Sequence, residues 1–175
     1  MKTRKKSEST PKTIHFKDHP EFTPNLTPRQ IMLRGSFGGT YWRPIYSSVI
    51  HKKLKNIHRK YPKEWWEGIP EDHLTRPWED YDPSINQYKV KVGTTLEFWQ
   101  EKQWIRALHP YGWFHWYCDF YQGKRGPDDE RQIKRWQRLA GPKGRFSNNL
   151  RNRIKAGKDS LPMRQTLQHW AFALD

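Results

Sequence analysis

The spacing of apolar residues along the chain predicts a mainly helical fold. In several segments apolar positions recur three and four residues apart, which places their side chains on one face of a helix. The first helix is expected to follow Thr27, with Pro28 at its first position, Gln30 as the capping-box partner and Gly35 at its end. We expect about six helices in all. The candidate segments after the first helix are residues 47–61, 94–108, 112–123, 126–141, 141–158 and 160–175.

Two neighbouring segments differ sharply in pattern. In residues 47–61, Ile50, Leu54 and Ile57 lie at helical spacing among lysines and arginines, which predicts an amphipathic basic helix. Residues 61–93 contain four prolines and three tryptophans, which indicates a long irregular segment held in place by its indole rings. Helix is expected to resume at Thr94.

Composition adds an aromatic core to this picture. Only 34% of the residues are hydrophobic and the mean hydropathy is −1.13, yet 15% are aromatic and ten are Trp. We therefore predict a mainly α, compact single domain with an aromatic core over residues 21–175, preceded by a flexible basic tail at residues 1–20. A single cysteine, Cys118, excludes an internal disulfide framework. With no apolar run long enough to span a bilayer, the expected location is intracellular, nuclear or cytoplasmic.

Charge points to a polyanionic partner. The chain carries 33 Lys and Arg against 18 Asp and Glu, a net charge of +15. Residues 1–60 hold 14 basic and 3 acidic side chains, residues 61–122 hold 6 and 10, and residues 123–175 hold 13 and 5. Two basic flanks thus enclose an acidic middle, and nucleic acid, either DNA or RNA, is the expected partner because basic side chains neutralise its phosphates.

The candidate phosphate-binding residues lie mainly in the C-terminal flank. A basic ridge is expected on the helix within 126–141, and the turn GPKGRF at residues 141–146 opens the next helix, for which Ser147 is the expected cap. The candidates are Arg43, Lys124, Arg125, Arg131, Lys134, Arg135, Arg138, Lys143, Arg145, Arg151 and Arg153. The earlier glycine loop at residues 35–39 is interpreted as a turn that allows close packing, and Arg43 beside it either supports that loop or reaches a phosphate.

Catalytic chemistry has less support. The helix within 112–123 is mostly aromatic, with His115, Cys118 and Asp119 on one narrow polar stripe. His115 and Asp119, one turn apart, are candidates for an acid–base pair, and the alternative is that the stripe is the side of the helix that meets solvent. His15 and His19 are also one turn apart, but they lack a third ligand. We expect no metal and no cofactor, and the sequence favours a binding protein over an enzyme.

Four segments carry a resemblance to a known family. LTPRQIMLRGSFGGTYWRPI, YGWFHWYCDFYQGKRGPDDERQIKRW, AGPKGRF and RQTLQHW resemble motifs of a family of uncharacterised proteins from fungi, algae and large DNA viruses, over residues 22–175. The resemblance implies a compact intracellular domain and carries no function. That family usually has Arg at the position of Asp119, which argues against an acid–base pair there.

Three function classes remain open. The first is a nucleic-acid-binding protein that contacts the phosphate backbone through its basic helices and the GPKGRF turn. The second is a structural or scaffold protein, for example of a virus particle, whose basic faces meet acidic protein partners. The third is a nucleic-acid-processing enzyme with its polar stripe in a basic cleft. No membrane partner is expected.

Overall fold

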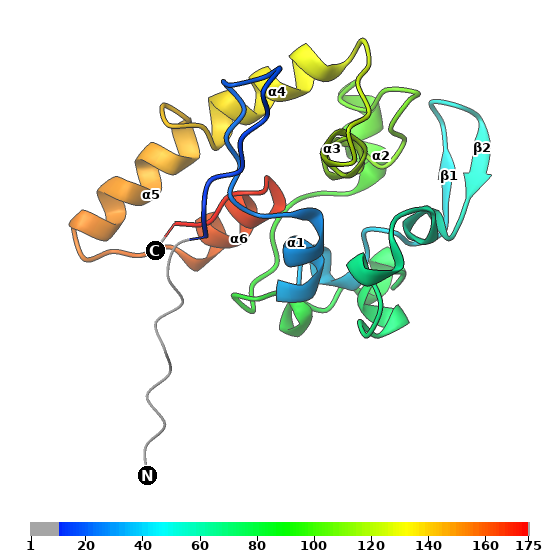
Figure 1. Cartoon of the computed structure of the whole chain (residues 1–175). Coiled ribbons are helices and arrows are strands. Elements are labelled where there is room, and N and C mark those ends of the chain that lie inside the picture. Colours follow the sequence, from blue (N-terminus) through cyan, green and yellow to red (C-terminus); the bar gives the residue numbers. More distant parts are fainter. Residues whose placement is uncertain (1–10, 175) are drawn as a thin grey trace.

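The computed structural model describes residues 11–174, which fold around one aromatic core (Figure 1). The α-helices of this part of the chain are α1 (Pro28–Arg34), α2 (Leu96–Glu101), α3 (Trp113–Tyr121), α4 (Asp129–Leu139), α5 (Arg145–Lys155) and α6 (Leu161–His169). A short antiparallel hairpin consists of β1 (Ile45–Ser47) and β2 (Lys52–Leu54). In Figure 1 the hairpin and α5 lie at opposite sides of the molecule. The predicted mainly helical class is confirmed, and none of the described helices is long and apolar enough to cross a membrane.

The irregular segment at residues 61–93 is also confirmed. It contains single turns of 3-10 helix at Lys63–Trp65, Glu71–His73, Trp78–Asp80 and Pro83–Ile85. Each turn either follows a proline or begins with one. Proline fixes its own φ and lacks an N–H donor, so it can start a turn but does not continue one.

The predicted helix at 47–61 is wrong. Residues 45–54 form the hairpin, in which Ile45 pairs with Leu54 and Ser47 with Lys52, and a 3-10 turn follows at Ile57–Lys60. His51 and Asn56 have positive φ values of 54° and 57°, which interrupt any helix through this segment. Leu54 of β2 and Ile57 of the 3-10 turn pack on the core from two different elements, so their helical spacing does not indicate a helix.

The helix after residue 94 is shorter than predicted. Its N-cap is Thr95, not Thr94, and the Thr95 hydroxyl accepts a hydrogen bond from the Phe98 N–H at 3.1 Å. The helix ends at Glu101 because Gln103 adopts a positive φ of 58°. Residues 102–108 therefore form a loop that brings Trp104 back over α2.

The glycine loop before Tyr41 serves close packing. Gly35 has φ 96°, and a Cβ atom there would lie 1.9 Å from the carbonyl oxygen of Ile85. Gly38 has φ 58°, and its Cβ would lie 2.5 Å from the ring of Tyr81. The loop is thus a packing element between α1 and the irregular segment.

The Thr27–Gln30 capping box of α1 is present as predicted, with hydrogen bonds of 2.8 and 3.1 Å.

Aromatic rings are the largest fully buried side chains of the core, and α3 runs through it. The ring centroid of Phe22 lies 5.5 Å from that of Trp116, 5.7 Å from Tyr117 and 5.0 Å from Trp136. His115 and Cys118 of the predicted polar stripe are buried, so the stripe does not meet solvent at these two residues. The solvent-facing alternative for the stripe is therefore wrong at these two positions.

Helices α4 and α5 are joined through the GPKGRF turn. α5 begins at Arg145, and Ser147, the expected cap, lies inside the helix, where its buried hydroxyl donates to the Ala140 carbonyl at 2.8 Å. Gly144 occupies the N-cap position instead. A Cβ at Gly144 would lie 2.5 Å from the carbonyl oxygen of Leu139, so the end of α4 and the start of α5 are in close contact.

The two ends of the described chain are tied together. The Asn25 side chain donates to the Ala173 carbonyl and accepts from the Ala173 N–H, both at 2.8 Å. Packing also begins before the expected boundary at residue 20, because the Phe16 ring lies 4.9 Å from that of Phe120. Residues 1–10 of the expected tail lie outside the described part of the chain.

Candidate nucleic-acid interface

A pocket of about 780 Å³ brings four of the predicted basic residues together. Arg43 follows the glycine loop, Arg135 and Arg138 lie on α4, and Arg145 is the first residue of α5. Within residues 11–174, no Asp or Glu lines this pocket. The charge of its lining is therefore positive.

Ten aromatic side chains form a large part of the pocket wall. They come from almost every part of the chain and comprise Phe37, Tyr41, Trp78, Tyr81, Trp99, Trp104, Tyr111, Trp113, Phe114 and Trp170. Trp104 is 41% exposed, and Trp78, Trp99 and Trp170 are half-buried. These four indoles present ring surface to the pocket that the core does not cover, and such surface suits a flat, apolar group.

Arg135 is half-buried in this wall. Its Nη1 donates to the Gln132 side-chain oxygen at 2.8 Å, and its guanidinium lies 5.3 Å from the centre of the Trp170 ring. Burial, assisted by the neighbouring charge of Arg131, lowers the pKa of Arg135 to about 10. The side chain remains a cation at neutral pH, held by a ring and an amide rather than by a carboxylate.

Arg43 has a similar environment on the other side of the pocket. Its Nη1 donates to the Thr40 carbonyl at 3.0 Å, and its guanidinium lies 5.6 Å from the Trp78 ring centre. Burial lowers the pKa of Arg43 as well. The bond to Thr40 gives the expected support of the glycine loop, and the same side chain lines the pocket, so contact with a phosphate stays a prediction.

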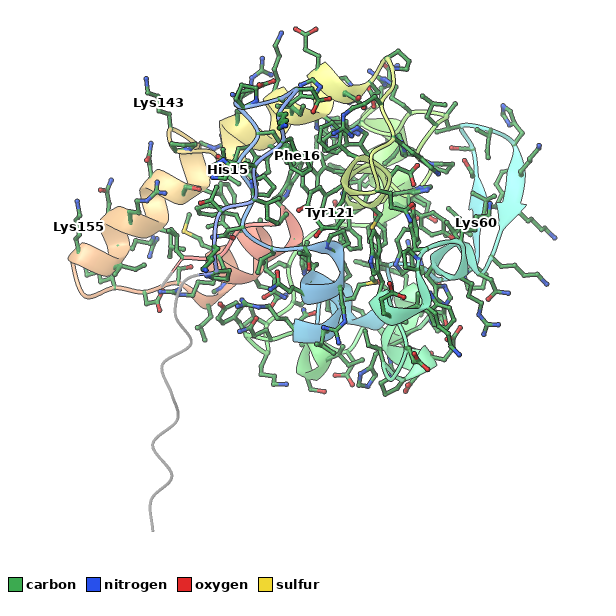
Figure 2. All side chains as sticks on the ribbon, in the orientation of Figure 1. His15, Phe16, Lys60, Tyr121, Lys143 and Lys155 are labelled. Atoms are coloured by element: carbon green, nitrogen blue, oxygen red, sulfur yellow. The ribbon has the colours of Figure 1, made fainter. Side chains whose placement is uncertain are left out.

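The turn and the outer face of α5 carry the remaining cations without carboxylate partners. Lys143 and Arg145 are exposed, and Arg153 contacts only the Asn149 amide oxygen, at 3.2 Å, among the hydrogen bonds of residues 11–174. Arg151 donates to the Pro142 carbonyl at 3.4 Å. Figure 2 shows Lys143 and Lys155 directed away from the body of the fold. We call the turn and α5, with Lys143, Arg145, Arg151 and Arg153, the α5 face.

Four predicted cations are engaged inside the chain instead. Arg131 binds Asp128 through two hydrogen bonds of 2.6 and 2.8 Å, and Lys134 binds Glu130 at 2.8 Å. Asp128, the expected cap of α4, is thus occupied by Arg131 and makes no capping hydrogen bond. Two of the four cations of the basic ridge predicted on α4 are therefore neutralised, and Arg135 and Arg138 make no such ion pair within residues 11–174.

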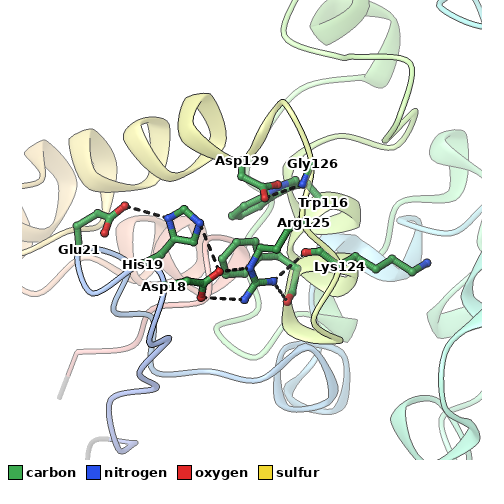
Figure 3. A network of polar contacts seen from close by, with 9 residues as sticks. Asp18, His19, Glu21, Trp116, Lys124, Arg125, Gly126 and Asp129 are labelled. Atoms are coloured by element: carbon green, nitrogen blue, oxygen red, sulfur yellow. Dashed lines mark hydrogen bonds and ion pairs between the residues drawn. The ribbon is translucent and has the colours of Figure 1, made fainter.

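Arg125 and Lys124 hold the loop between α3 and α4 (Figure 3). Arg125 donates to the Asp18 carboxylate at 2.6 Å and to the Phe120 carbonyl at 2.8 Å, with its guanidinium 3.6 Å from the Phe120 ring centre. Lys124 lies 3.8 Å from Asp119. Arg125 accordingly fastens the N-terminal segment to the end of α3, which is a structural role.

The structure does not pair His115 with Asp119. His115 is buried, its Nδ1 accepts a hydrogen bond from the Tyr111 N–H at 3.4 Å, and burial lowers its pKa to about 3. Asp119 instead contacts His109 Nε2 at 3.0 Å and accepts a hydrogen bond from the Tyr61 hydroxyl at 2.7 Å. Burial opposes ionisation of Asp119, but these hydrogen bonds outweigh it and lower its pKa. The predicted acid–base pair is thus replaced by a Tyr61–Asp119–His109 network.

His109 and Tyr61 were not candidates from the sequence. Tyr61 lies 58 positions before Asp119 and belongs to the irregular segment, so only the fold brings the two together. A small pocket of about 170 Å³ adjoins His109 and Asp119. Among residues 11–174, no group of three or more His, Cys, Asp and Glu side chains is arranged to hold a metal ion.

Comparisons of the chain with models of known protein families, with curated protein sequences and with solved structures each find no match. The family resemblance of the sequence motifs therefore stays a prediction.

Proposed function

We propose that this protein binds nucleic acid through its phosphate groups. The observation that carries the proposal is the sorting of the predicted basic residues. Four of the eleven pair with carboxylates, and the other seven make no such ion pair within residues 11–174. Those seven lie in the aromatic pocket or on the α5 face: Arg43, Arg135, Arg138, Lys143, Arg145, Arg151 and Arg153.

The arrangement suits a phosphate backbone for an electrostatic reason. Cations that lack an internal carboxylate partner break no ion pair when they bind phosphates, and each phosphate contact releases condensed counterions. Arg145 belongs both to the pocket and to the α5 face, so one polyanion could contact the two without a gap. The proposal therefore requires binding that weakens steeply with added salt.

The test is a salt series on the purified protein, freed of co-purified nucleic acid. Fluorescence anisotropy measures binding of labelled single- and double-stranded DNA and RNA to the wild type and to the triple variant K143A/R145A/R151A. Each phosphate contact removed lowers the slope of log affinity against log salt by about 1, so the triple variant is expected to lose about 2–3 from that slope. The matched control is K52A/K53A/K55A, which removes three exposed charges near the hairpin, on the other side of the molecule.

Two results would contradict this assignment. Equal losses in both triple variants would assign binding to net charge rather than to the α5 face. Absence of binding at low salt would support the scaffold alternative, in which the same cations meet an acidic protein surface. The processing-enzyme alternative has its own test, because cleavage of a bound oligonucleotide that is lost in Asp119→Asn would implicate the Tyr61–Asp119–His109 network.

A further inference from the structure

We infer that the aromatic pocket holds one unpaired nucleotide of a single strand, with its base between indole rings and its phosphate on the arginines. The inference rests on the proposed function and adds the strand type and the mode of recognition. The pocket volume of about 780 Å³ lies in the range of small-molecule sites. Its wall contains ten aromatic side chains, and its charged groups are all arginines within the described residues.

The pocket requires an occupant that is flat as well as anionic. Half-buried Trp78, Trp99 and Trp170 and exposed Trp104 offer faces on which a base can stack. Arg43 and Arg135 are cations partly removed from water, and within residues 11–174 no carboxylate forms an ion pair with either; Glu97 and Glu79 act on Arg43, and Asp128 on Arg135, from beyond contact distance. Desolvated charge without a counter-ion in direct contact is unfavourable, and a phosphate would supply that contact. A nucleotide combines the two properties in one group.

The concave shape selects an unpaired base. In a duplex each base is stacked and paired, so a base can enter a pocket only from a single strand or after it has been flipped out. The exposed cations next to the pocket favour a strand over a free nucleotide. Arg145 lines the pocket and begins α5, and Lys143, Arg151 and Arg153 continue the positive surface beyond it. A backbone leaving the pocket at Arg145 would reach Lys143 of the turn and one side of α5, which carries Arg151 and Arg153 on different sides.

The experiment compares ligands that differ in one property at a time. Anisotropy titrations use oligothymidylate, an abasic deoxyribose-phosphate strand of the same length, a duplex of the same length, and thymidine monophosphate as a competitor. Base stacking is expected to make oligothymidylate bind roughly 5- to 150-fold more tightly than the abasic strand. The duplex is expected to bind at the level of the abasic strand, and the mononucleotide more weakly than oligothymidylate.

Trp104→Ala separates stacking from charge. Trp104 is 41% exposed, so its removal leaves the core intact, whereas its ring lines the pocket. The variant is expected to weaken binding of oligothymidylate, to leave binding of the abasic strand unchanged, and to keep the wild-type salt slope. Tyr46→Ala, at a 57% exposed aromatic residue of the hairpin, is the matched control and is expected to change neither. Photo-crosslinking of an iodouridine strand is expected to label Trp78, Trp104 or Trp170.

The outcomes distinguish this inference from the proposed function. Salt-sensitive binding of all strands, with the abasic strand or the duplex as tight as oligothymidylate, would overturn the pocket while leaving phosphate binding in place. Equal affinity for the mononucleotide would overturn the strand as occupant. Crosslinks confined to the hairpin would overturn the location. Absence of binding to every polyanion would instead remove the proposed function itself.

Discussion

The Tyr41 hydroxyl caps α3 from a distant part of the chain, and Tyr41→Phe removes that single atom. Gly112 occupies the N-cap position of α3 and has no side chain to accept from the first turn. The Tyr41 hydroxyl accepts from the His115 N–H at 2.9 Å and donates to the Tyr111 carbonyl at 2.7 Å. Because Tyr41 is buried, neither backbone group can turn to water when the hydroxyl is lost.

The expected cost follows from these two contacts. Loss of a side-chain cap destabilises a helix by about 1 kcal/mol, and an unsatisfied buried carbonyl costs about 1–3 kcal/mol more. Tyr41→Phe is therefore expected to lower the free energy of unfolding by about 2–4 kcal/mol. For a chain of this size that corresponds to a decrease in Tm of roughly 4–16 °C. Phenylalanine fills the same space, so packing makes little contribution.

Urea unfolding followed by tryptophan fluorescence, together with calorimetry, measures this loss. Tyr46→Phe is the matched control, because Tyr46 is exposed and no hydrogen bond of its hydroxyl occurs within residues 11–174. It is expected to stay within about 0.5 kcal/mol of the wild type. If Tyr41→Phe also stayed within that range, the hydroxyl would not be the cap of α3.

Three further predictions concern the close packing at Gly35, the protonation of His169 and the reactivity of the Cys118 thiol. Gly35→Ala is expected to destabilise the protein by more than about 2 kcal/mol, because its Cβ would lie 1.9 Å from the Ile85 carbonyl oxygen at φ 96°; urea unfolding measures the loss. Burial lowers the pKa of His169 to about 3, so its neutral form stabilises the fold above pH 6.5, and that stability is lost as the pH falls toward 3. Between pH 7 and pH 5 this contribution of His169 to the free energy of unfolding falls by about 2 kcal/mol. In His169→Gln the free energy of unfolding is expected to vary less with pH by that amount. Burial raises the pKa of the Cys118 thiol, so Ellman's reagent is expected to react with it only after unfolding in urea.

Each of these predictions has a control or a contrary result. Gly157→Ala introduces a side chain at φ 71° into open space, so a loss equal to that of Gly35→Ala would leave backbone strain, not the contact with Ile85, as the cause. His51→Gln changes an exposed histidine, and an equal loss of pH dependence there would refute the role of burial. Fast reaction of the native thiol would show that the core around Cys118 opens.

A local signal predicts the start of α1 correctly, whereas the caps expected at Thr94 and Ser147 are replaced by Thr95 and Gly144. The capping box of α1 involves residues three positions apart, and it forms as expected. The helix predicted over residues 47–61 is wrong because apolar residues of this segment lie at helical spacing by coincidence, while the positive φ of His51 and Asn56 leaves no periodic signal in the sequence. Tertiary contacts decide the conformation of this segment rather than local preference.

The candidate site likewise contains residues that the sequence identifies and residues that only the fold brings together. Charge alone identifies Arg135 and Arg145 as candidates, and the structure places both at one pocket. It also engages Arg125 with Asp18, a residue 107 positions away, which no local pattern indicates. The indoles of the pocket are equally invisible as a group, because Trp78, Trp104 and Trp170 come from distant segments. The fold decides which cations are free to meet a ligand.

The tie between Asn25 and Ala173 has a consequence for synthesis on the ribosome. Asn25 closes both its amide hydrogen bonds on Ala173, 148 positions later, and the Trp136 indole donates to the Trp170 carbonyl at 2.8 Å. A nascent chain that still lacks Trp170 and Ala173 leaves the Asn25 amide and the Trp136 indole without these partners. These contacts therefore form only after residue 173 has been synthesised, and pairing of such sequence-distant segments is slow and leaves apolar surface open to chaperones in the meantime.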